Sequence, residues 1–293
     1  MTTLRTPRGS DRPALVAAGE QPAAAGEAVH RIAERIQRRW PKQPRAGIIL
    51  GTGLGSLAEQ IERAVEIGYD ELPGFPRATA VGHRGRWVCG ELAGQPVLAM
   101  DGRLHLYEGY TAEQITLPVR VMHALGAELL IVSNASGGLN PLFRSGDLMV
   151  IQGHVNLMGS RGGLLACAPP LPSRNGTRYL YDPQLAAHAL AASRRLNVPC
   201  YPGIYVSVLG PNYETRAEYR FMRRVGGDAV GMSSVPEILV AAQCGLRVLA
   251  LSTITNVACP DAPFSVTAQE VVDIAATAEP SLRAIVCDEL DCL

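Results

Sequence analysis

The chain has 293 residues, 47% of them hydrophobic, and its 27 Lys and Arg residues balance its 27 Asp and Glu residues at a formal net charge of zero. A neutral composition excludes the basic surface of a nucleic-acid-binding protein, and no apolar run approaches the roughly 18 residues of a spanning helix, which argues against a membrane partner. Seven scattered cysteines without a C-x-x-C pair indicate reduced thiols and no metal site, so we expect a cytoplasmic protein whose partner is a small molecule.

The first 20 or so residues are polar and interrupted by proline. This composition is typical of a leader without a fixed fold, so we expect residues 1–25 to lie outside the domain and residues 26–293 to form a single domain. A first helix, ending before "PKQPR", is predicted by apolar residues at helical spacing: Val29, Ile32, Ala33, Ile36 and Trp40.

Short apolar runs bounded by turn residues then alternate with helical patterns. The predicted strands are "GIIL" (47–50), "RWVCGEL" (86–92), "PVLAM" (96–100), "ELLIVS" (128–133), "LMVI" (148–151), "IYVSVL" (204–209) and "LRVLALSTI" (246–254). The predicted helices cover 55–64, 111–125, 183–195, 214–225, 234–244 and 267–287. Several runs are continuously apolar, as expected of central strands covered on both faces. The fold class is therefore α/β: a single domain with a mixed, largely parallel central β-sheet flanked by helices.

The loop "GTGLGS" (51–56) follows a buried strand and allows three interpretations. Read from Gly53 it satisfies the G-x-G-x-x-A form of a dinucleotide fingerprint, with Glu71 about 20 residues beyond. A strand, glycine and helix in succession also suit a bare phosphate, because free backbone N–H groups and the helix dipole meet there and Thr52 adds a hydroxyl. The third interpretation is an ordinary tight turn.

The segment "DGRLHLYEGY" (101–110) concentrates polar side chains after the strand "PVLAM". If the strand continued, Arg103, His105 and Tyr107 would point to one face and suit phosphate and sugar hydroxyls. The alternative is the polar outer face of an edge strand.

Small or polar residues follow further strands in "VSNASGGLNP" (132–141), "GPNYETRAEYR" (210–220), "GMSSVPE" (231–237) and "LSTITN" (251–256). Each could be ordinary on its own: the first a turn, and Glu214 a helix-capping residue. Together with the loop 51–56 they place five such loops at strand ends, and ligands of open α/β sheets bind at the carboxyl ends of the strands.

These motifs, in order from Gly47 to Asn256, resemble the trimeric purine nucleoside phosphorylases, which split 6-oxopurine nucleosides with phosphate. The matching stretches are "GTGLG", "GHRGR", "GRLHLYEGY", "SNASGGLNP", "GPNYET", "GDAVGMSSVPE" and "ITN". The resemblance favours the phosphate interpretation of the first loop over the dinucleotide. It implies a homotrimer that binds a purine nucleoside and uses inorganic phosphate as co-substrate, with no other cofactor.

The resemblance also assigns roles to individual residues, with Thr52 standing where the family commonly has serine. It implies phosphate contacts from Thr52, His83, Arg103, His105, Ala135 and Ser233; ribose contacts from Tyr107 and Met232; base contacts from Tyr213, Glu214 and Asn256; and catalytic roles for His105, Glu214 and Asn256.

These residue types suit the reaction. Glycosidic cleavage passes through an oxocarbenium-like ribosyl cation, so a phosphate held beside C1′ is both electrostatic stabiliser and nucleophile. An ionised Glu214 accepts hydrogen bonds only, which fits the N1–H of hypoxanthine or guanine and not N1 of adenine. We therefore expect inosine and guanosine to be preferred to adenosine.

The chain departs from the family pattern at two places. Ala268 stands at the position of a histidine that contacts the ribose 5′-hydroxyl, and residues 159–180 lack the family's Asn-Pro-Leu-x-Gly-Pro-Asn run and a phenylalanine that reaches the neighbouring subunit. Two alternatives therefore stay open: a phosphorylase for 5′-modified nucleosides such as 5′-methylthioadenosine, and a relative that binds nucleoside or phosphate without turnover. An NAD-dependent oxidoreductase would rest on the glycine motif alone.

Overall fold

The computed structural model describes residues 22–80, 82–159, 179–259, 261 and 267–293. The leader predicted over residues 1–25 falls mostly outside these ranges, as does nearly all of the segment 159–180. The helices are α1 (Pro22–Arg39), α2 (Ala112–Ala124), α3 (Pro183–Arg195), α4 (Arg216–Arg224), α5 (Val235–Gln243) and α6 (Ala268–Asp291), with short 3-10 helices η1 (Gly55–Gln60), η2 (Tyr69–Glu71) and η3 (Leu106–Glu108). None of the described helices combines the length and hydropathy that a membrane crossing requires.

The strands are β1 (Ala46–Leu50), β2 (Glu62–Gly68), β3 (Arg86–Leu92), β4 (Gln95–Asp101), β5 (Leu129–Gly138), β6 (Leu148–Asn156), β7 (Cys200–Ser207), β8 (Ala229–Gly231) and β9 (Arg247–Val257). They form one sheet in the order β2-β3-β4-β1-β5-β8-β7-β6-β9, with β5 also paired to β9. Because of this extra pairing, strands β5 to β9 close on themselves into a ring. Central pairs such as β1 with β4 and β5 with β9 are parallel, while β3 with β4 is antiparallel. The predicted mixed α/β sheet is confirmed.

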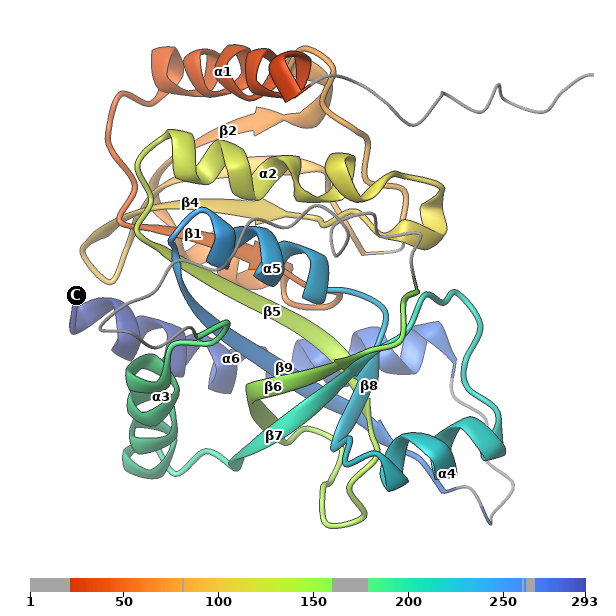
Figure 1. The fold of residues 1–293 in the computed structure, drawn as a ribbon. Helices are drawn as coiled ribbons and strands as arrows, with labels where there is room; N and C mark the ends of the chain where they lie inside the picture. The colour runs from red at the N-terminus through yellow and green to blue at the C-terminus, as the bar shows by residue number, and fades with distance from the viewer. Residues whose placement is uncertain (1–21, 81, 160–178, 260, 262–266) are drawn as a thin grey trace, which may run out of the picture.

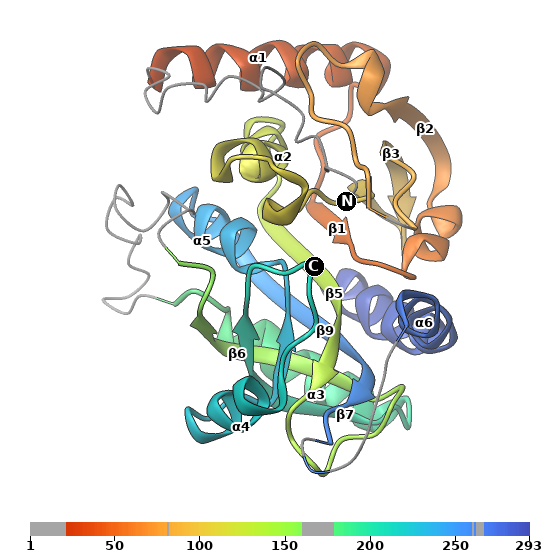
Figure 2. The ribbon, with the colours of Figure 1, turned by 90° about the vertical axis from the view of Figure 1, so that its right-hand side faces the viewer.

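Helices cover both faces of this sheet (Figures 1 and 2). Alternate residues of β5 divide between two cores: Leu130 and Val132 join the core beneath α1, α2 and α5, whereas Leu129 and Ile131 join the core beneath α3 and α6. Such alternation buries a strand on both sides, which explains why its sequence reads as a continuous apolar run.

The predicted helix over 55–64 is wrong. Only one short 3-10 helix, η1, forms there, and the chain then enters β2, which the sequence analysis missed. Most β2 residues are exposed or half-buried, and a bulge between Glu62 and Val65 interrupts the pairing with β3. An exposed, bulged edge strand lacks the alternation that identifies strands in sequence. The dinucleotide interpretation also loses the long helix that it needs after the glycine loop.

Two other local predictions are corrected. The polar segment after β4 is not a continuing strand, because Gly102 adopts φ +117 and turns the chain out of the sheet. A Cβ atom at this glycine would lie 3.0 Å from the Cβ of His83, so the turn also brings two site segments together. Conversely, residues 134–138 are not a loop: they continue β5, and their backbone pairs with β9.

Candidate active site

Polar side chains from distant parts of the chain meet where β1, β4 and β8 end. Thr52 follows β1, Arg103 and His105 lie between β4 and η3, and Ser233 lies between β8 and α5. β1 and β4 are parallel, so these two strands end at the same edge of the sheet. Ser233 contacts Arg103 there from the end of β8, which runs antiparallel to β5.

Arg103 is the most deeply buried cation of this group, with 1% of its surface exposed. Its Nη1 donates to the Ser133 carbonyl oxygen at 3.1 Å, to Ser233 Oγ at 2.8 Å and to Ser234 Oγ at 2.9 Å. Its Nε lies 3.3 Å from Oε1 of Glu237, a buried carboxylate of α5. Nη2 is also buried and has no hydrogen-bond partner among the described residues. A buried guanidinium with a free donor is a strong site for an anion.

His83 lies beside the backbone of Arg103. Its Nδ1 accepts a hydrogen bond from the backbone N–H of Arg103 at 3.2 Å, so the neutral ring carries its proton on Nε2, 3.5 Å from the Thr52 hydroxyl. Burial, reinforced by the nearby His105 and Arg103, lowers the pKa of His83 to about 3. The ring is therefore a neutral donor at physiological pH.

His105 is held by a carboxylate that the sequence analysis did not assign. Glu108 Oε1 accepts from the His105 backbone N–H at 2.8 Å and lies 2.9 Å from its Nδ1. Burial opposes ionisation of Glu108, but hydrogen bonds from His105 and Thr79 outweigh it and lower its pKa to about 2. Because the carboxylate keeps the proton on Nδ1, Nε2 of His105 remains available to a ligand. The ring also stacks on Tyr107, with centroids 4.7 Å apart.

Tyr107 and Met232 lie together against Gly210. A Cβ atom at this glycine would lie 2.9 Å from Met232 Cγ and 3.1 Å from Tyr107 Cδ1, and its φ of +74 suits glycine. Burial raises the pKa of Tyr107 to about 12, so its hydroxyl is un-ionised. The two predicted ribose residues therefore share one wall of the site.

A chain of buried polar groups starts at the guanidinium and runs across the sheet. Asn134 Nδ2 donates to Ser234 Oγ at 2.8 Å, and Asn134 Oδ1 accepts from Ser252 Oγ at 2.6 Å. Ser252 Oγ lies 2.6 Å from Ser136 Oγ. Ser234 holds this position with φ +69, a strained value for a residue other than glycine. Strain of this kind persists only where neighbouring contacts fix it, and here both Arg103 and Asn134 bind the hydroxyl.

The same network reaches Asn256 near the end of β9. The Thr255 hydroxyl lies 3.2 Å from the Ser136 carbonyl oxygen and 3.1 Å from Asn256 Oδ1, and donates to them. With Oδ1 engaged, Asn256 Nδ2 is the group left to donate elsewhere. Asn256 also pairs in register with Gly137, which leaves space beside its amide.

Tyr213 and Glu214, the residues predicted to bind the base, are more exposed than Arg103 and His105. Glu214 is half-buried and precedes α4, whose N-cap is Thr215: its hydroxyl accepts from the Glu218 N–H while Glu218 reaches back. The helix-capping interpretation of Glu214 is therefore wrong. Burial raises the pKa of Glu214, against a hydrogen bond from Tyr219 that lowers it. Tyr213 is half-exposed, and the described residues show no hydrogen bond from either residue to Asn256.

Two predicted positions contribute no side-chain contact in the described part of the chain. Ala135 lies within β5, paired with Thr253, and can offer a ligand only its backbone and small side chain. Ala268 is the exposed first residue of α6, after the N-cap Thr267. The residues that the sequence analysis missed are Ser234, Glu237 and Glu108. Ser234 and Glu237 both belong to the motif "GMSSVPE". Nothing in their spacing indicated that they would contact Arg103.

Comparisons with known proteins show which family the chain resembles. A family model described as "Phosphorylase superfamily" matches residues 45–290. The chain is 48% identical to purine nucleoside phosphorylase 1 of Bacillus subtilis over 235 residues, which make up 78% of this chain and 85% of that protein. It is 44% identical to the purine nucleoside phosphorylase of Mus musculus over 221 residues, covering 73% and 76% of the two chains. The crystal structure of Schistosoma mansoni purine nucleoside phosphorylase in complex with inosine matches with a TM-score of 0.84 and 33% identity, covering 91% of this chain and 96% of the other.

Proposed function

Since the chain belongs to the phosphorylase superfamily, among its purine nucleoside phosphorylases, we propose that it cleaves inosine, guanosine and their deoxy forms with phosphate. The products are the free base and ribose or deoxyribose 1-phosphate. Phosphate is the co-substrate, and the chemistry requires no further cofactor. We place the enzyme in the cytoplasm as a homotrimer, on the strength of the family resemblance.

One observation carries the proposal most directly: Nη2 of the buried Arg103 has no hydrogen-bond partner among the described residues, while Nη1 is held by three acceptors. A dianionic phosphate at Nη2 would satisfy this donor and offset the buried charge. Thr52, Ser233 and Nε2 of His83 supply further donors, the His105 ring lies beside that of His83, and the backbone at Ala135 completes the set. Glu237, 3.3 Å from Nε, orients the guanidinium.

Phosphate in this position would do the central chemistry. As the glycosidic bond lengthens, positive charge develops on the ribosyl C1′ and its ring oxygen, and the phosphate anion stabilises that charge. Tyr107 and Met232 hold the ribose against the phosphate, so that a phosphate oxygen bonds to C1′ as the base leaves with the glycosidic electron pair. Attack on the face opposite the base inverts C1′.

The base end of the site would stabilise the leaving purine. Asn256 Nδ2 is free to donate to N7 or O6, where electron density grows as the bond breaks. Glu214, when ionised, accepts from N1–H and, in guanine, from the 2-amino group. Tyr213 packs near the ring. Adenine offers an acceptor at N1 and a donor at position 6, so both polar contacts would be mismatched.

A panel of nucleosides tests this assignment. The purified enzyme, saturated with phosphate, is given inosine, guanosine, adenosine and 5′-methylthioadenosine separately, and the release of free base is followed. We expect kcat/KM for inosine and guanosine to exceed that for adenosine and 5′-methylthioadenosine at least 100-fold, as two mismatched polar contacts would require. Equal turnover of adenosine would overturn the roles given to Glu214 and Asn256.

A further inference from the structure

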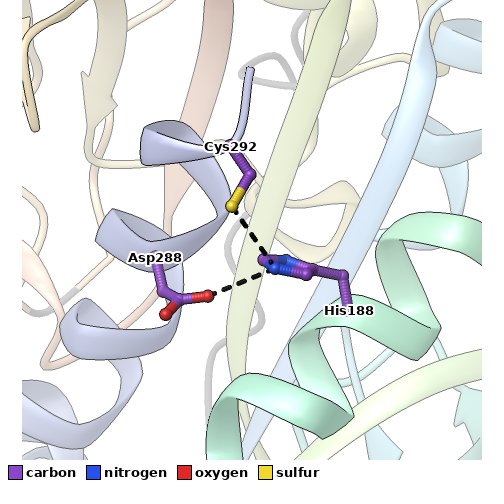
Figure 3. A group of neighbouring side chains, drawn as sticks. All are labelled: His188, Asp288 and Cys292. Atoms are coloured by element: carbon purple, nitrogen blue, oxygen red, sulfur yellow. Dashed lines mark hydrogen bonds and ion pairs between the residues drawn. The ribbon is translucent and has the colours of Figure 1, made fainter.

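A second cluster of reactive side chains lies between α3 and the C-terminal end of α6 (Figure 3). His188 belongs to α3, Asp288 to the last turns of α6, and Cys292 follows that helix. At 1.5 Å per residue the cluster is roughly 27 Å along α6 from Glu270, which lies at the end of that helix near Tyr213. No hydrogen bond or ion pair between described residues joins it to the candidate active site.

The spacing of the three side chains fits a metal ion. His188 Nε2 lies 3.4 Å from Asp288 Oδ2 and 3.5 Å from Cys292 Sγ, and one ligand atom from each residue lies within 4.8 Å of the others. A tetrahedral zinc ion binds nitrogen, oxygen and sulfur at about 2.0–2.3 Å, which separates neighbouring ligand atoms by roughly 3.3–3.6 Å. The distance from nitrogen to carboxylate is long for a hydrogen bond but matches an edge of this tetrahedron.

The other ring nitrogen of His188 faces a buried carboxylate. Nδ1 lies 2.9 Å from Oε1 of Glu289, whose side chain is 2% exposed, although neither atom has a well-aligned hydrogen bond. Metal-binding histidines almost always direct their second nitrogen to a carboxylate or carbonyl, which fixes the ring and its tautomer. Glu289 therefore orients His188 with Nε2 toward the cluster. The contact between His188 and Glu289 is independent evidence for the site, because it involves neither Asp288 nor Cys292.

Asp288 is also positioned before any ion arrives. Arg195 Nη2 donates to its two oxygens at 2.8 and 2.6 Å, which fixes the plane of the carboxylate. Since each carboxylate oxygen has two lone pairs, Oδ2 can bind a metal while it accepts from Arg195. Cys292 is exposed, so an ion can reach the thiol from solvent.

We propose that His188, Asp288 and Cys292 bind a zinc ion, with water in the fourth position and Glu289 orienting the histidine. Imidazole, thiolate and carboxylate together suit zinc rather than magnesium or calcium, which prefer oxygen ligands. As the Zn–S bond forms, the Cys292 thiol releases its proton to solvent. The ion ties α3 to the end of α6, away from the phosphorolysis site. The site escaped the sequence analysis because its ligands are 104 residues apart and form no C-x-x-C pair.

Titration of the full-length, chelator-treated protein with zinc and then cobalt(II) tests the proposal. We expect one zinc per chain at this site and, with cobalt, the near-ultraviolet charge-transfer absorption of a thiolate ligand. Cys292→Ser should abolish that absorption and weaken zinc binding at least 10-fold, and Glu289→Gln should weaken it about 10- to 100-fold. Cys259→Ser, which alters another exposed cysteine, is the matched control and should bind like the wild type.

Comparing zinc affinity in the wild type and in Cys292→Ser shows whether the ion binds at this site or elsewhere on the protein. Absence of zinc binding in the wild type would overturn the proposal, and so would zinc affinity that is equal in the wild type and Cys292→Ser. The cobalt spectrum and the affinities do not depend on phosphorolysis, so neither result depends on the proposed function.

Discussion

Arg103 Nη1 lies 2.8 Å from Ser233 Oγ, although 130 residues separate the two along the chain. This contact joins the segment after β4 to the segment before α5, and Nη2 of the same guanidinium has no hydrogen-bond partner within the part of the chain that the structure describes. Four groups hold the arginine: the Ser133 carbonyl and two serine hydroxyls accept from Nη1, and the Glu237 carboxylate lies 3.3 Å from Nε. We propose that phosphate binds at the buried donor Nη2.

Arg103→Lys tests this anion site. Lysine keeps the positive charge but loses the planar set of donors, so it cannot bind the serines and phosphate together. We expect the KM for phosphate to rise about 100-fold, with a smaller change in the KM for inosine, because charge-assisted hydrogen bonds contribute about 1.5–3 kcal/mol each. Arg84→Lys, at a half-exposed arginine paired with Glu59, is the control and should leave both constants unchanged. Equal phosphate KM values for the two variants would contradict the assignment.

Glu214→Gln tests base recognition. The variant replaces an acceptor-only carboxylate by an amide, so kcat/KM for inosine should fall about 10- to 150-fold, while the slow reaction of adenosine should change little. Thr215→Ala is the matched control, because Thr215 and not Glu214 caps α4. It should lower the free energy of unfolding by about 0.5–2 kcal/mol and leave inosine kinetics unchanged. If both variants lose stability and activity alike, Glu214 has a structural role only.

The stability of the protein should depend on His83 in acid. The folded state holds the pKa of His83 at about 3, below its ordinary value of 6.5, because the ring is buried as a neutral group. Between these values the unfolded chain binds a proton that the folded chain does not, so stability falls as pH drops from about 6.5 toward 3, by at most about 1.4 kcal/mol per pH unit. Urea unfolding at pH 4–8 measures this slope. It should be shallower in His83→Gln, and an equal slope would exclude His83 as its source.

Recognition of the ribose 5′-hydroxyl should be weak. Ala268 is an exposed residue at the start of α6 and has no hydrogen-bonding side chain. We expect kcat/KM for 5′-deoxyinosine to lie within about 10-fold of that for inosine, since one neutral hydrogen bond contributes about 0.5–1.5 kcal/mol. Ala268→His should increase the preference for inosine. A much poorer reaction of 5′-deoxyinosine with the wild type would show that another residue binds this hydroxyl.

The sequence predicted the central strands and most helices, because β1, β4, β5 and β9 are apolar enough to be recognised without a structure. It failed at β2, an exposed edge strand whose side chains carry no alternating pattern. It also ended β5 too early, since Asn134 and Ser136 look like loop residues. Their polar side chains instead both bind Ser252 inside the core, and only tertiary structure reveals this.

The candidate site, too, was only partly predictable from the sequence. The motifs drew attention to Arg103, His83 and His105, and the structure brings these three together. The sequence could not show that Glu108 holds His105 or that Glu237 faces Arg103, because acidic residues at such positions are common on solvated surfaces. Nor could it distinguish Glu214 from a helix cap, a question that the Thr215 hydrogen bond resolves.

The most direct test of the account is the initial rate of hypoxanthine formation from inosine as a function of phosphate concentration, with ribose 1-phosphate measured in the same samples. We predict a rate that is negligible without phosphate, saturates as phosphate is added, and yields one ribose 1-phosphate for each hypoxanthine. Phosphate-independent release of free ribose, or binding of inosine without turnover, would contradict it.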